Sequence, residues 1–64
     1  MKYPNVKVKL LGKNGNAFAI LGLCQRAAKK AGLTAEQIKE FMDEATSGDY
    51  DNLLGTCMKY FDVN

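Results

Sequence analysis

NAFAILGLCQRAAKKAG, residues Asn16–Gly32, is the most apolar run of the chain. Asn16 follows a turn of glycine and asparagine and is a good helix N-cap. Gly32 supplies the left-handed residue that commonly ends a helix. The apolar residues between them recur at the spacing of a helix face. We therefore predict a helix here, and we expect the segments on both sides, which each carry one apolar face, to pack around it.

A strand is predicted before this helix, over Asn5–Leu11. Its side chains alternate between apolar and cationic, which is typical of a half-buried strand. The apolar ones are Val6, Val8 and Leu10, and the cationic ones are Lys7 and Lys9. The turn Gly12–Gly15 follows, because Asn-Gly cannot continue a strand.

Two further helices are predicted after Gly32. Thr34 and Gln37 fit a capping box at the start of one, and Asp49 caps the other. The order strand, helix, helix, helix predicts an α+β fold with a single domain over residues 1–64. Its predicted core is Val6, Val8, Leu10, Phe18, Leu21, Cys24, Ile38, Phe41, Leu53, Leu54, Cys57 and Phe61.

One strand cannot satisfy its own backbone groups, so it needs a partner. The candidates are the C-terminal tail, Tyr60–Val63, and the same strand of a second chain. A chain this short rarely obtains more than about 3–5 kcal/mol from its own core. A second chain would also enlarge the core. We therefore predict a homodimer through the Asn5–Leu11 strand.

Charge is distributed unevenly along the chain, although the net charge is only +2. Residues 1–32 carry seven cations and no acid, whereas residues 33–64 carry seven acids and two lysines. The candidate basic surface is Lys7, Lys9, Lys13, Arg26, Lys29 and Lys30. It allows nucleic-acid binding as an alternative function, but these cations form no single block and match no nucleic-acid-binding motif.

The sequence contains few features that indicate catalysis or metal binding. There is no histidine and no Cys-x-x-Cys, so the common zinc patterns are absent. Cys24 and Cys57 lie in apolar helical patterns, where a thiol has a raised pKa and is a poor nucleophile. We predict no cofactor and no enzymatic activity. With no signal-peptide core and no membrane-length apolar run, a cytoplasmic setting without a membrane partner is expected.

The two polar turns, Gly12–Asn16 and Thr46–Asp51, are candidates for a binding site if they meet in space. The first turn matches neither common phosphate-loop pattern, so capping accounts for most of its residues. The candidate binding residues are Asn14, Gly15, Asn16, Ser47, Asp49 and Asp51. These observations favour a small non-enzymatic interaction or regulatory module with an unknown protein partner.

Four segments also carry a resemblance to a known family. They are GKNGNAFAILG (Gly12–Gly22), AKKAG (Ala28–Gly32), EATSGDYDNLL (Glu44–Leu54) and CMKY (Cys57–Tyr60). The chain resembles a family of small bacterial and phage-type proteins of unknown function, and Glu44–Leu54 is the most specific part. The resemblance implies a similar fold and brings no activity, cofactor or catalytic residue with it.

Overall fold

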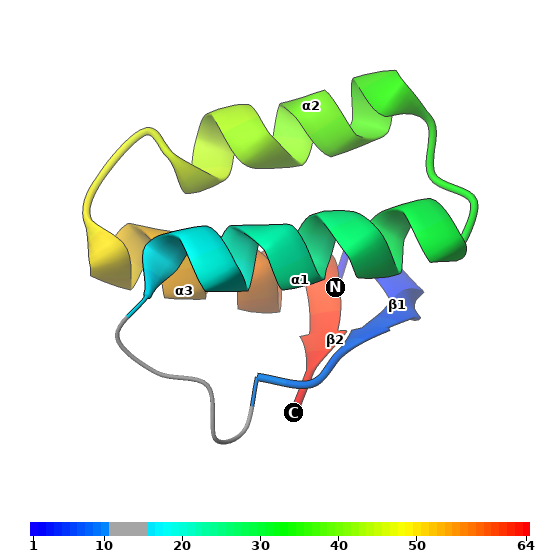
Figure 1. Ribbon diagram of the computed structural model, residues 1–64, viewed down its shortest axis with the longest axis horizontal. Coiled ribbons are helices and arrows are strands. Elements are labelled where there is room, and N and C mark those ends of the chain that lie inside the picture. Colours follow the sequence, from blue (N-terminus) through cyan, green and yellow to red (C-terminus); the bar gives the residue numbers. More distant parts are fainter. Residues whose placement is uncertain (11–15) are drawn as a thin grey trace.

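A computed structural model describes residues 1–10 and 16–64. Its elements in chain order are β1 (Tyr3–Val8), α1 (Ala17–Lys30), α2 (Ala35–Ala45), α3 (Tyr50–Tyr60) and β2 (Phe61–Val63). In the view of Figure 1, α2 lies above α1 and the two strands lie below it. The predicted α+β single domain is confirmed, with a short C-terminal strand in addition. The predicted turn Gly12–Gly15 and the end of the predicted strand at Leu11 lie outside the described residues.

The two strands pair in parallel as β1 and β2. Lys7 is in register with Asp62 and Val8 with Val63, and the register shifts between Tyr3 and Lys7. The strand therefore begins two residues earlier than predicted, because its first residues pair beside the end of α3. Of the two predicted strand partners, the C-terminal tail takes this place within one chain. This edge of β1 is therefore paired without a second chain.

Both ends of α1 follow the local sequence. The Asn16 Oδ1 accepts the backbone N–H groups of Phe18 and Ala19 at 3.0 and 3.2 Å. At the other end Gly32 has φ of +95°, and its N–H donates to the Lys29 carbonyl at 3.0 Å. A left-handed glycine at this position closes the helix, so the predicted cap and stop are confirmed.

The other two helices also begin at their predicted caps. The Thr34 hydroxyl accepts the N–H of Gln37 at 3.1 Å, and the Gln37 side chain accepts the N–H of Thr34 at 2.7 Å. This reciprocal pair is the predicted capping box. Asp49 accepts the N–H of Asn52 at 2.9 Å and so starts α3.

The core gathers where the helices meet the strands. Phe41 and Phe61 are fully buried, with ring centroids 4.8 Å apart. Seven predicted core residues are buried: Val6, Val8, Cys24, Phe41, Leu53, Cys57 and Phe61. Four more, Leu10, Leu21, Ile38 and Leu54, are half-buried and pack against that core.

Phe18 was wrongly assigned to the core, because its side chain is 86% exposed. The buried row of α1 is Ile20, Cys24 and Ala28, each one helical turn from the next. Phe18 precedes Ile20 by two residues and therefore lies about 200° away around the helix. Packing against the strands and α3 determines which row of α1 is buried. The sequence of α1 alone does not show it, because apolar residues also flank this row.

Candidate binding groove

Two lysines of the N-terminal segment lie beside the C-terminal half of α1. The pleat of β1 turns Val6 and Val8 inward, where both are buried, and leaves Lys7 exposed; Lys9, which directly follows β1, is exposed as well. The Lys7 ammonium donates to the Asp62 carboxylate at 2.9 Å across the strand pair. That lysine side chain is still 69% exposed, so an exposed ion pair of this kind leaves it accessible to a ligand.

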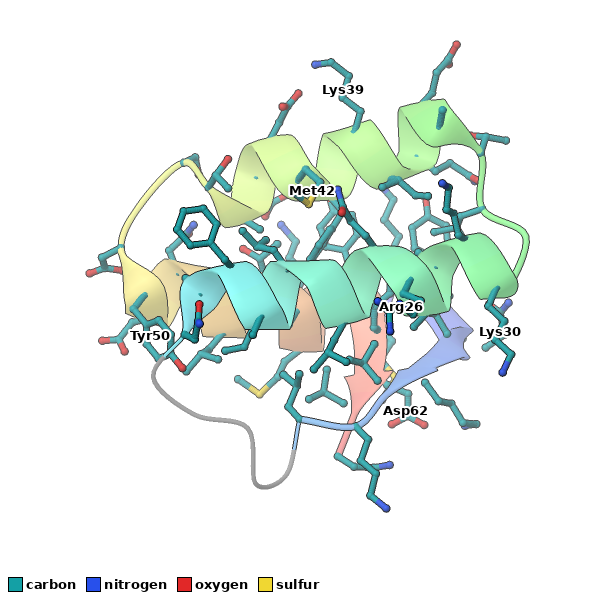
Figure 2. All side chains as sticks on the ribbon, in the orientation of Figure 1. Arg26, Lys30, Lys39, Met42, Tyr50 and Asp62 are labelled. Carbon is teal, nitrogen blue, oxygen red and sulfur yellow. The ribbon has the colours of Figure 1, made fainter. Side chains whose placement is uncertain are left out.

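Two cations of α1 face these lysines. Arg26 and Lys30 are one turn apart, and Figure 2 shows both on the side of α1 nearest the strands. Between the two rows lies a hollow of about 260 Å³, and a second of about 250 Å³ adjoins it. The two hollows share Lys7, Ala27 and Lys30.

We call this surface the β1/α1 groove. Its lining is Asn5, Lys7, Val8, Lys9, Leu23, Arg26, Ala27, Lys30 and Ala31. The groove thus has four cationic side chains around a floor of short aliphatic ones. No carboxylate belongs to this lining, and Asp62 reaches only Lys7 among the ion pairs of the described residues.

The other predicted cations do not join the groove. Lys29 lines a hollow between α1 and α2, together with Lys39 and Met42. Lys13 lies outside the described residues. The predicted basic surface is therefore divided, and Lys29 and Lys30, although adjacent in the chain, face different hollows.

The sequence carried a usable signal for this grouping. Lys7 and Lys9 are two apart on the predicted strand, and Arg26 and Lys30 are four apart on a helix, so each pair shares a face. Their approach depends on β1 packing on α1, which residue spacing alone does not specify. Lysines scattered along the sequence thus come together in space.

The second candidate site is the end of the molecule where the two polar turns were predicted to meet. Ala17 and Phe18, at the start of α1, line one hollow of about 280 Å³ with Gly48, Asp49 and Tyr50. The start of α1 and the turn between α2 and α3 therefore share one end of the molecule (Figure 1). Asn14 and Gly15, two of the candidate binding residues, lie outside the described residues.

The polar groups at this end are largely used in capping. Asn16 caps α1 and Asp49 caps α3, while the Ser47 hydroxyl donates to the Glu44 carbonyl at 2.7 Å. Asp51 lies in the first turn of α3, where an acid is favoured by the helix dipole. The geometry thus gives these residues a structural role, and the hollow beside them is mainly apolar.

The two thiols lie at the centre of the fold. Cys24 of α1 and Cys57 of α3 are fully buried, with sulfur atoms 3.5 Å apart. Their hydrogen bond and then burial raise the pKa of Cys24, which keeps that thiol protonated. Across residues 1–10 and 16–64, no three histidine, cysteine or carboxylate side chains gather as metal ligands would.

No protein-family model, curated protein or solved structure matches this chain. None of the helices within the described ranges is both long and apolar enough to cross a membrane.

Proposed function

We propose that the protein is a small, non-enzymatic interaction module that binds an acidic segment of a protein partner in the β1/α1 groove. The observation that carries this proposal is the convergence of Lys7, Lys9, Arg26 and Lys30 on one groove. Carboxylates form short, charge-assisted hydrogen bonds with such groups, and arginine can hold a carboxylate with two donors at once.

The groove's floor favours a protein segment over a nucleic acid. Leu23 and Ala27 offer aliphatic contacts that suit the methylene groups of an acidic peptide. Proteins that bind single-stranded nucleic acid usually stack the bases on aromatic side chains. The exposed Phe18 and Tyr50 line the hollow at the polar turns instead, and no aromatic residue lines the groove.

Affinity for an acidic peptide tests this proposal. A fluorescent peptide rich in glutamate and aspartate is titrated with the wild type and with Lys30→Gln and Lys29→Gln, using anisotropy. The two variants lose the same charge from the same end of α1, but only Lys30 lines the groove. We expect Lys30→Gln to weaken binding several-fold and Lys29→Gln to change it little. Equal effects of both variants, or no binding by the wild type, would contradict the proposal.

Nucleic-acid binding is the second candidate, and the four cations of the groove favour it. Phosphate contacts make affinity depend on salt, with a slope of about −0.7 per neutralised phosphate for single strands. Four contacts would therefore give a slope of about −3 on a log–log plot. An oligonucleotide that binds more tightly than the acidic peptide, with this slope and with loss in Lys30→Gln, would replace the first proposal by the second.

Homodimerisation, a cytoplasmic setting and kinship with small phage-type proteins stay predictions. Pairing with β2 satisfies one edge of β1, so a second chain is not needed there. Sedimentation equilibrium at micromolar concentration distinguishes a single-chain mass from a doubled one.

A further inference from the structure

The outer edge of β1 carries a further inference, which rests on the proposed function. We propose that the acidic partner segment binds in extended form, as a third strand along this edge, with some of its carboxylates facing the cations of the groove. Charge attraction alone specifies neither the conformation of the partner segment nor its backbone contacts.

Hydrogen bonds to Asn64, which directly follows β2, show which backbone groups of the N-terminal segment remain on the outer side. The Asn64 N–H donates to the Val8 carbonyl at 3.0 Å, and the Leu10 N–H donates to the Asn64 carbonyl at 3.1 Å. Asn64 is therefore hydrogen-bonded to the residues on both sides of Lys9 and not to Lys9 itself. Because neighbouring residues of an extended chain direct their backbone groups to opposite sides, the N–H and C=O of Lys9 point away from β2.

By the same alternation, the N–H and C=O of Lys7, which precedes Val8 within β1, also point away from β2. Among residues 1–10 and 16–64 the sheet has two strands, so β1 has a neighbour on one side and an open edge on the other. Both Lys7 and Lys9 line the β1/α1 groove. An edge that has no strand partner among the described residues thus borders a cationic groove, and edges of this kind accept extended peptides by strand addition.

Charge decides which strand can be added. Lysines on an edge strand discourage uncontrolled pairing, because a neutral strand gains nothing from them and a basic one is repelled. A second copy of the N-terminal segment would place Lys7 and Lys9 opposite like charges, which destabilises a sheet. An acidic strand instead matches Lys7 and Lys9 from the N-terminal segment and Arg26 and Lys30 from α1. The occupant that fits this edge is therefore an extended acidic peptide.

Peptides with a modified backbone test this mode of binding. In one peptide of alternating glutamate and valine, the amides that would face β1 are N-methylated. In its control, the same number of N-methyl groups is moved by one residue, onto amides that would face away. The two peptides have equal charge, so a difference between them reports the main-chain hydrogen bonds.

We expect the unmodified peptide and the control to bind alike, and the first peptide to bind about tenfold or more weakly. Binding of the unmodified peptide should also slow hydrogen exchange of the Lys9 amide. Equal binding by all three peptides, with the loss in Lys30→Gln retained, would overturn strand addition and leave the proposed function standing. Failure of every peptide to bind would remove both. Protection of the Lys9 amide by self-association without peptide would make a second copy the occupant and also overturn the proposal.

Discussion

At the scale of single residues, Glu44 joins the two C-terminal helices. Its carboxylate accepts from the Lys59 ammonium at 2.7 Å and from the Tyr60 hydroxyl at 2.9 Å. The hydrogen bond from Lys59, followed by that from Tyr60, lowers the pKa of Glu44. Burial and then the Glu44 carboxylate raise the pKa of Tyr60 to about 12. The two shifts have opposite signs, so they affect stability at opposite ends of the pH range.

Tyr60 should make the fold lose stability in alkaline solution. Its phenol ionises near pH 10 in the unfolded chain and near 12 in the folded one. The stabilisation is therefore complete below pH 10 and disappears as the pH rises to about 12. Denaturant unfolding measured from pH 9 to 12 should show this loss, and Tyr60→Phe should show less of it. An equal loss of stability in both proteins would show that ionisation of Tyr60 is not its cause.

Glu44 should act in acid with the opposite sign. Its pKa is lowered on folding, so its stabilisation is present above the ordinary carboxyl pKa of 4.5 and is lost as the pH falls through the depressed value. Unfolding measured between pH 6 and 2 should therefore show a smaller decrease in Glu44→Gln than in the wild type. Matching pH profiles of the two proteins would exclude the Glu44 carboxylate as a cause of the loss of stability in acid.

Substitution of Phe18 and of Phe41 tests which of the two rings belongs to the core. Phe41→Ala leaves a cavity and should cost about 3–5 kcal/mol, which is comparable to the whole stability expected of a chain this short. Phe18→Ala removes an exposed ring and should change the free energy of unfolding by about 0.5 kcal/mol or less. Circular dichroism during urea unfolding measures both. A Phe18→Ala protein as unstable as Phe41→Ala would contradict the placement of Phe18.

At the scale of elements, the helix ends were predictable because their determinants are local. Asn16, Thr34 and Asp49 each bond to backbone groups two or three residues away, so a short window of sequence holds the whole signal. By contrast, β2 has only three residues, too few for an alternating pattern. Its pairing depends on where α3 ends relative to β1, which is a property of the packed chain.

The capping box at the start of α2 is expected to stabilise the protein measurably. Thr34→Ala removes the acceptor for the Gln37 N–H and should lower the free energy of unfolding by about 1 kcal/mol. Thr34→Ser keeps a hydroxyl at the same position and is the control. Urea unfolding of the two variants checks this prediction, and equal stabilities for alanine and serine would show that the cap contributes nothing.

At the scale of the whole molecule, folding rearranges a charge pattern that is simple in the sequence. The basic N-terminal half and the acidic C-terminal half meet in ion pairs such as Lys2 with Glu40 and Lys7 with Asp62. These pairs are exposed and contribute little stability. The candidate site was predictable only in part, because the spacing of Arg26 and Lys30 defines a face, whereas their approach to Lys7 and Lys9 requires the tertiary fold.

The location of an acidic ligand on the surface tests binding in the β1/α1 groove directly. An isotopically labelled sample is titrated with the alternating glutamate and valine peptide, and amide shifts are followed by nuclear magnetic resonance. We predict that the largest shifts fall on Lys7, Lys9, Ala27 and Lys30, and that Lys30→Gln reduces them. Shifts concentrated instead on Gly48, Asp49 and Tyr50, at the hollow beside the polar turns, would contradict binding in the β1/α1 groove.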